Sequence, residues 1–156
     1  MAGLLETPLL VRPPPHPHES WIGYYLRLSS ANGAPFVTWV ASALGQNANR
    51  EVHSVVSEWT KPDTPARAAP LLGVSADRLN AIALTRSQEA DAGRTKFSLG
   101  KLGLDRKYLR LERPQVCPLC LQKNQYAHRA WDLASVTACP EHRVHLVDTC
   151  PQCNAP

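Results

Sequence analysis

Apolar residues recur at intervals of three and four in several short stretches after residue 19, a pattern that predicts amphipathic helices. The first helix covers residues 21–28, with Ser20 as its N-cap and the pair Asn32-Gly33 as its left-handed stop. We therefore expect the first half of the chain to form a small helical domain. Two further short helices are predicted in it, at residues 35–44 and at about 51–59.

Another pair of helices is predicted around a glycine turn. An apolar helix ends at Gly73, and Ser75 then caps a second helix with Leu79 and Ile82 on its inner face. Glycine at such a turn is typical of helix-turn-helix proteins, although helical hairpins with a glycine turn also occur in proteins that do not bind DNA. We predict a helical, helix-turn-helix-like domain over residues 19–92.

The segments on either side of this domain are proline-rich or basic. Residues 1–18 contain a Pro-Pro-Pro-His-Pro run, and because proline fixes φ and lacks an N–H, we predict an extended arm. Residues 93–116 form a basic connector without clean periodicity, apart from a strand predicted around residues 108–111. Its cations are either solvated or in contact with DNA phosphates or an acidic partner. The candidate contact residues are Arg94, Lys96, Lys101, Arg106, Lys107 and Arg110.

Composition favours a small folded protein without a membrane span or a disulfide framework. The chain has 156 residues, 19% charged and 44% hydrophobic side chains and a formal net charge of +4, which suits one or two small folded domains. No apolar run is long enough to span a bilayer, and no secretory signal is recognisable, so we expect a cytoplasmic protein without a membrane segment. Five cysteines, an odd number, favour a metal site or free thiols over a disulfide framework.

Cysteine and histidine residues in the last third of the chain have the spacing of a zinc site. Cys117 and Cys120 form one knuckle, and Cys139 and His142 form a second one eighteen residues beyond Cys120. Together they predict a closed Cys3His zinc site, within a zinc ribbon over residues 117–156. Residues 129–138 are predicted to be a helix or a strand that covers the metal with Trp131, Leu133 and Val136.

A third knuckle, Cys150 and Cys153, has no partner knuckle of its own. We interpret it as half of a second zinc site whose other ligands lie beyond Pro156; in an alternative pairing, it shares one zinc ion with the first knuckle. A redox dithiol would need a thioredoxin-like setting, which the sequence lacks. A catalytic zinc keeps an open ligand position, so four good ligands predict a structural site and a protein that is not an enzyme.

Two blocks of the sequence resemble the TniQ family of transposition proteins. The first consists of Pro17-His18-Glu19-Ser20-Trp21, Tyr24-Tyr25-Leu26-Arg27-Leu28 and Asn32-Gly33, and it is similar to the opening of that family. The second is similar to the family's cysteine-rich run, and it consists of Cys117-Pro118-Leu119-Cys120-Leu121, Trp131, Cys139-Pro140-Glu141-His142, Leu146 and Cys150-Pro151-Gln152-Cys153. With the helical stretch between the blocks, the resemblance covers most of residues 15–156.

The resemblance implies a non-enzymatic target-selection adaptor of a prokaryotic DNA transposon. Family members carry a helix-turn-helix-type domain before tandem zinc ribbons, and they connect a targeting module to the AAA+ ATPase regulator that recruits the transposase. In CRISPR-associated transposons that module is an RNA-guided effector complex, so the implied partners are the ATPase, the targeting complex and DNA near the target site. The alternative is a small zinc-dependent transcription regulator that reads DNA through residues 75–84. Few basic residues lie near that segment, namely Arg78 and Arg86.

Overall fold

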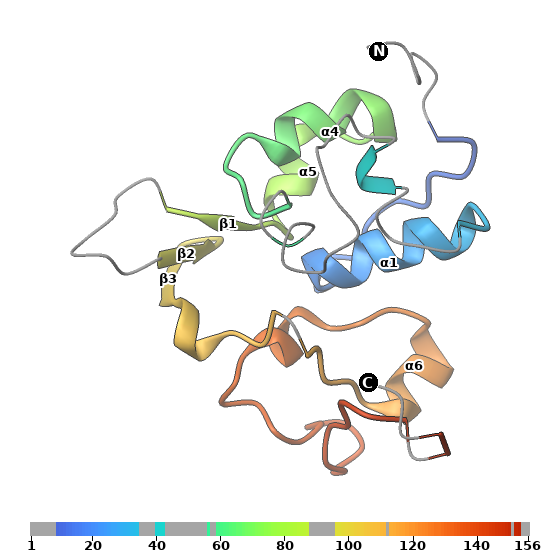
Figure 1. Cartoon of the computed structure of the whole chain (residues 1–156), viewed down its shortest axis with the longest axis vertical. Helices are drawn as coiled ribbons and strands as arrows, with labels where there is room; N and C mark the ends of the chain where they lie inside the picture. Colours follow the sequence, from blue (N-terminus) through green and yellow to red (C-terminus); the bar gives the residue numbers. More distant parts are fainter. Residues whose placement is uncertain are drawn as a thin grey trace.

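The computed structural model describes residues 9–34, 40–42, 56, 59–87, 96–111, 113–150 and 152–153. Its helices are α1 (Trp21–Ala31), α4 (Thr64–Leu72), α5 (Ala76–Asn80) and α6 (Pro118–Asn124), with short 3-10 helices η1 (Arg106–Tyr108) and η2 (Arg129–Asp132). Its strands are β1 (Leu84–Arg86), β2 (Lys96–Leu99) and β3 (Leu102–Asp105). We call the described residues from 19 to 87 the helical part and residues 113–150 the cysteine-rich part. In Figure 1 the two parts lie one above the other, with the sheet at their side.

Helix α1 forms where the apolar spacing predicted it, and both of its ends are capped by side chains. The Ser20 hydroxyl accepts a hydrogen bond from the Gly23 N–H at 3.2 Å, which satisfies one of the free donors of the first turn. At the other end, the Asn32 side chain donates to the Leu28 carbonyl oxygen at 2.8 Å. The residues on its inner face are buried: Trp21, Ile22, Tyr24, Tyr25, Leu28 and Ser29.

Helices α4 and α5 form the predicted pair around a glycine turn. Gly73 has φ of 64°, a left-handed conformation that glycine adopts without steric cost, and Ser75 caps α5 by accepting from the Arg78 N–H. A DNA-binding helix-turn-helix is not confirmed. Helix α5 has only five residues, or about 7.5 Å of helix, and the Arg78 side chain donates to the Pro15 carbonyl at 3.4 Å.

The helices predicted at 35–44 and 51–59 lie largely outside the described residues. Within them, residues 40–42, Val56 and Trp59 are helical, and Val40, Ala41, Val56 and Trp59 are buried. None of the helices in the described ranges combines the length and the apolar character that crossing a bilayer requires.

The sheet is the main departure from the predicted architecture, which contained no strands between residues 84 and 105. Strands β1, β2 and β3 form an antiparallel sheet in sequence order, with Phe97 opposite both Arg86 and Leu104. Gly100, at φ of 60°, opens the two-residue loop between β2 and β3, a position that favours glycine in tight hairpins. The strand predicted around 108–111 is wrong: Tyr108 belongs to η1, and Leu109 forms a single bridge with Leu133.

Two separate clusters of buried residues hold the molecule together. The larger one joins α1, α4, α5 and the sheet, and its most fully buried side chains include Trp21, Trp59, Leu79 and Leu84. The smaller one has four buried members, three of which are cysteines, and it lies in the cysteine-rich part. The helical part therefore buries many large apolar side chains, whereas the cysteine-rich part buries few.

The proline-rich arm packs along the helical part instead of leaving it. Residues 9–16 contain no helix or strand. The Tyr24 hydroxyl donates to the Pro13 carbonyl at 3.1 Å, and the Arg27 guanidinium donates to the Pro14 carbonyl at 2.9 Å. Prolines lack an N–H but keep a carbonyl, so the arm is held by donors on α1.

Three hydrogen bonds join the N-terminal end of α1 to the cysteine-rich part. The Ser20 N–H donates to the Ala127 carbonyl at 2.7 Å, and the Arg129 N–H donates to the His18 carbonyl at 2.9 Å. The Ser20 hydroxyl, which also caps α1, donates to a carboxylate oxygen of the buried Asp132 at 3.0 Å. The start of the helix is thus tied directly to η2.

Candidate metal centre

The first knuckle is positioned by the start of α6. Cys117 is the N-cap residue, and Pro118 follows it in the first turn, where its missing N–H is not needed. The Cys117 carbonyl accepts from the Leu121 N–H at 3.0 Å, so the helical turn begins at the cysteine itself. One helical turn then brings the Cys120 side chain onto the same face as that of Cys117.

The second knuckle is a tight turn that ends at a left-handed residue. The Arg143 N–H donates to the Cys139 carbonyl at 2.8 Å, and Arg143 has φ of 54°. Inside the turn, the His142 N–H donates to the Cys139 sulfur at 3.4 Å. Burial raises the pKa of the Cys139 thiol, but hydrogen bonds with His142, Cys120 and Glu141 together outweigh burial and lower this pKa to about 6. The turn therefore favours the thiolate form that a metal requires.

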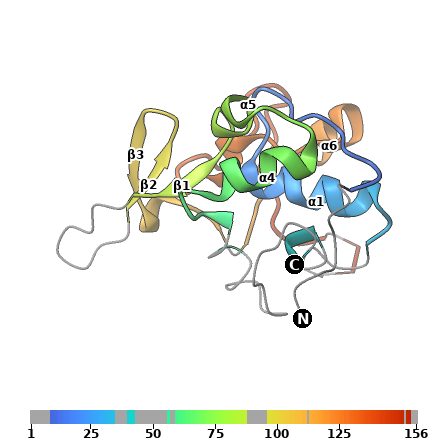
Figure 2. The same cartoon turned by 90° about the horizontal axis from the view of Figure 1, so that it is seen from above.

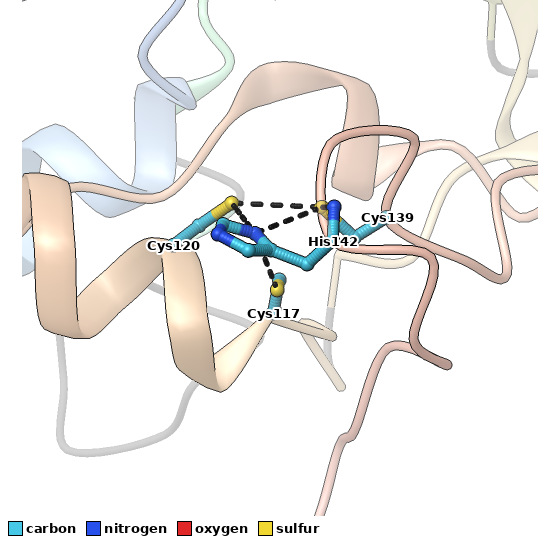
Figure 3. Close-up of side chains that lie close together, drawn as sticks. All are labelled: Cys117, Cys120, Cys139 and His142. Carbon is cyan, nitrogen blue, oxygen red and sulfur yellow. Dashed lines mark hydrogen bonds between the residues drawn. The ribbon is translucent and has the colours of Figure 1, made fainter.

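The structure brings the four predicted ligand residues together, with their donor atoms all within 4.8 Å of one another (Figure 3). The Nδ1 atom of His142 lies 3.6, 3.2 and 3.6 Å from the sulfurs of Cys117, Cys120 and Cys139. The Cys120 and Cys139 sulfurs are 3.5 Å apart. A tetrahedral zinc site with ordinary bond lengths has edges of about 3.5–3.8 Å between its ligand atoms.

This donor set fits a metal ion that is held for structure. Three sulfurs and one imidazole nitrogen match the preference of zinc, and the three cysteines are buried. Glu141 lies between two ligand residues in sequence, but its carboxylate is exposed and paired with Lys123 at 2.9 Å, and the Lys123 hydrogen bond lowers the pKa of Glu141. A zinc ion held by all four of these side chains would have no position left open for a substrate or a reactive water.

The chain between the knuckles covers the centre, but its secondary structure differs from the prediction. Residues 129–138 were predicted to be a helix or a strand, but they form the short η2 followed by irregular backbone. Trp131 is buried in the cysteine cluster as predicted, and Val136 packs against it. Sequence reasoning missed Gln115, a buried side chain whose amide donates to the carbonyls of Trp131 and Val136 and thereby fixes the loop.

The third knuckle stays apart from this centre. Cys150 and Cys153 are exposed, and among the described residues neither belongs to a group of three or more metal-binding side chains. Backbone N–H groups of Cys153 and Gln152 lower the pKa of Cys150, a hydrogen-bonding pattern like that at Cys139. The pairing with Cys139 and His142 is therefore the one present around Cys117 and Cys120, and a second site at the third knuckle stays a prediction.

The basic candidates lie along the sheet and the segment that follows it. Lys96 is on β2, Lys101 is in the hairpin turn, and Arg106 and Lys107 are on η1. Arg110 follows η1 and lies 3.9 Å from a carboxylate oxygen of Asp148. Arg94 lies outside the described residues.

Comparison with known families identifies one family whose model spans both parts of the chain. The family model named TniQ matches residues 10–146, which include the arm, the helical part, the sheet and the four residues of the metal centre. No curated protein matches the chain.

Proposed function

The chain belongs to the TniQ family of transposition proteins, and we propose that it is a target-selection adaptor that links a targeting complex on DNA to an AAA+ ATPase regulator. The family is one of non-catalytic adaptors in transposition. The observation that carries the proposal is the match over residues 10–146, which includes both the helical part and the metal centre. We further propose that the protein works in the cytoplasm of a prokaryotic cell.

The chemistry of the centre supports a scaffold more than a catalyst. In this proposal Cys117, Cys120, Cys139 and His142 hold one zinc ion, which supplies much of the folding free energy of the cysteine-rich part. The hydrogen bond between Ser20 and Asp132 connects the cysteine-rich part to the start of α1 and so fixes the position of that helix. A rigid two-part body of this kind presents fixed surfaces to partners, which is what an adaptor needs.

The proposed partners follow from the family. They are the AAA+ ATPase regulator, DNA near the target site, and an RNA-guided CRISPR effector or another targeting module. The alternative of a transcription regulator finds less support. Helix α5 is short, and its Arg78 side chain donates to a carbonyl of the arm. This helix therefore has few side chains that could form hydrogen bonds with base edges in a DNA groove.

The test is association between purified components. We expect the zinc-loaded chain to elute with the ATPase of the same transposon in the presence of ATP or a non-hydrolysable analogue and a DNA duplex. A transposition assay in cells should then fall to background with a Cys120→Ser variant and stay near the wild-type level with Ser135→Ala, a change at an exposed residue outside the centre. Absence of association under every nucleotide condition would contradict the adaptor role. Tight binding to one DNA sequence by the chain alone would favour the regulator.

A further inference from the structure

The hairpin of β2 and β3 stands out from the body of the molecule and carries positive charge. Figure 2 shows it reaching away from the helices. Lys101 lies exposed in its turn, and Arg106 and Lys107 lie exposed at the far end of β3. Over residues 96–108 the sequence has four cationic residues and a single acidic one, Asp105.

The strand register divides the hairpin into two faces. Phe97 is buried, and its cross-strand partner Leu104 packs against the main core. The opposite face consists of the pairs Lys96 with Asp105 and Ser98 with Gly103. Because Lys96 stands directly across from Asp105, their charges offset each other, and the surplus positive charge comes from the two ends of β3.

Gly103 is unusual for the middle of a strand. Its φ is not in the left-handed region, and a Cβ atom built on it would have no atom within 4 Å. Neither backbone conformation nor packing within the chain therefore requires glycine at this position. A bare backbone at a strand centre is typical of places where a ligand or another chain approaches closely.

We propose that this hairpin binds the phosphate backbone of duplex DNA without sequence preference. The inference rests on the proposed function, because it names the element by which the adaptor meets DNA near the target. Lys101 and Arg106 are five residues apart, or about 17 Å along an extended strand. The major groove is about 12 Å wide, so cations at both ends of β3, an edge strand of the sheet, are far enough apart to reach phosphates on either side of it.

Duplex DNA fits this surface better than an acidic protein does. Protein interfaces gather apolar and aromatic side chains at a desolvated centre and keep charges at the rim. Here the middle of the outward face holds Ser98 and Gly103, which offer almost no apolar area. Positive charge around a polar middle suits a sugar–phosphate backbone, because cations that bind phosphates release condensed counterions.

The first experiment measures the salt dependence of binding by the whole zinc-loaded chain. The probe is a fluorescein-labelled duplex of random sequence, followed by anisotropy at several salt concentrations. The double variant Lys101→Gln/Lys107→Gln should bind at least about tenfold more weakly, and the slope of log K against log salt should fall in magnitude by about 1.8.

A matched control removes the same net charge elsewhere. Arg12 lies exposed on the arm and Arg67 lies exposed on α4, so Arg12→Gln/Arg67→Gln should change the affinity less than about twofold. Equal losses in both double variants would mean that only net charge matters, and they would overturn the proposal. Stronger binding to labelled polyglutamate than to the duplex would also overturn it, and would assign the hairpin to an acidic protein.

The second experiment uses Gly103→Val, since a β-branched residue favours the strand and its Cβ meets open space. The variant should unfold at the same or a higher temperature than wild type, yet bind the duplex about three- to tenfold more weakly. Unchanged binding would show that DNA does not approach this face. Association of the hairpin variants with the ATPase, measured without DNA, tests the adaptor function separately, so the two proposals fail independently.

Discussion

The helical part and the cysteine-rich part reach a fixed structure by different means. The helical part buries large side chains such as Trp21, Tyr25 and Leu28, and each one contributes about 1.5–3 kcal/mol when removed from water. In the cysteine-rich part, the buried cluster within the described residues consists of three cysteines and Trp131. So small an apolar cluster does not offset the conformational entropy of about forty ordered residues. The helical part is therefore held by its core, whereas the cysteine-rich part depends, in our proposal, on a metal ion bound by its Cys3His group.

Loss of one metal ligand should have a large effect that is confined to the cysteine-rich part. We expect Cys120→Ser to reduce bound zinc from about one ion per chain to near zero, because three ligands and a hydroxyl hold zinc poorly. Apparent zinc binding in small modules contributes about 10–16 kcal/mol, so the cysteine-rich part should lose its fixed structure. NMR amide signals of residues 117–147 should collapse while those of α4 stay dispersed.

The matched control for that variant is Cys153→Ser, which changes an exposed cysteine outside the centre. It should keep the zinc content of the four-ligand site and the dispersed spectrum. A wild-type chain that remains fully folded after exhaustive chelation would refute the division of roles between the two parts.

Trp21→Ala should act on the other part with a smaller effect. The indole is 1% exposed, its N–H donates to the Trp59 carbonyl at 2.7 Å, and it packs edge-on against Tyr25 at 5.0 Å between ring centroids. Truncation leaves a cavity and an unpaired carbonyl, which should cost about 4 kcal/mol of unfolding free energy. Denaturant unfolding at constant zinc concentration measures it, with the exposed Leu26→Ala as the control. A loss below about 1 kcal/mol would show that the core matters less than its burial implies.

Local signals made part of this organisation predictable from the sequence. Ser20, Gly73 and Ser75 mark helix ends because caps and left-handed turns depend on neighbouring residues only. The four ligand residues were predictable because a knuckle is a short turn with a fixed spacing. Each of these features is decided within a few residues along the chain.

Features that depend on distant segments were missed. The strands have three or four residues each, too few to show a clear alternation of apolar and polar side chains. The one local signal for the hairpin was the Gly100-Lys101 turn between Leu99 and Leu102. Asp132 and Gln115 become important only through folding. Asp132 accepts a hydrogen bond from a serine 112 residues away, and Gln115 donates to carbonyls of η2 and of the irregular segment after it.

Arg27→Ala tests whether the arm belongs to the helical part. The guanidinium makes two hydrogen bonds of 2.7 Å to the carboxylate of Glu19, which is completely buried. Removing the cation leaves a buried charge without its partner, so we expect a loss of about 3 kcal/mol. Hydrogen exchange should also accelerate at His16, whose N–H donates to Glu19. Partial recovery in the double variant Glu19→Gln/Arg27→Met would assign the loss to the stranded charge; no recovery would assign it to packing.

Asp132→Asn should change the free energy of unfolding least, and at high pH it should raise this free energy where the other substitutions lower it. It tests the contact between Ser20 and Asp132, which joins the two parts. Burial raises the pKa of Asp132 to about 7, and the hydrogen bond from Ser20 offsets this only partly. A raised pKa means that the folded state holds the proton more tightly than the unfolded chain. The stabilisation from that proton is full below about pH 4 and is lost as pH rises towards 7. Asparagine stays neutral and still accepts from Ser20, so the variant should be more stable than wild type at pH 8, by about 1–2 kcal/mol. The difference in unfolding free energy should shrink at pH 6, and the metal centre, whose residues are the same in both proteins, should not contribute to it. Paired denaturant titrations at the two pH values measure it, and a pH-independent difference would mean that the Asp132 carboxylate is not the titrating group.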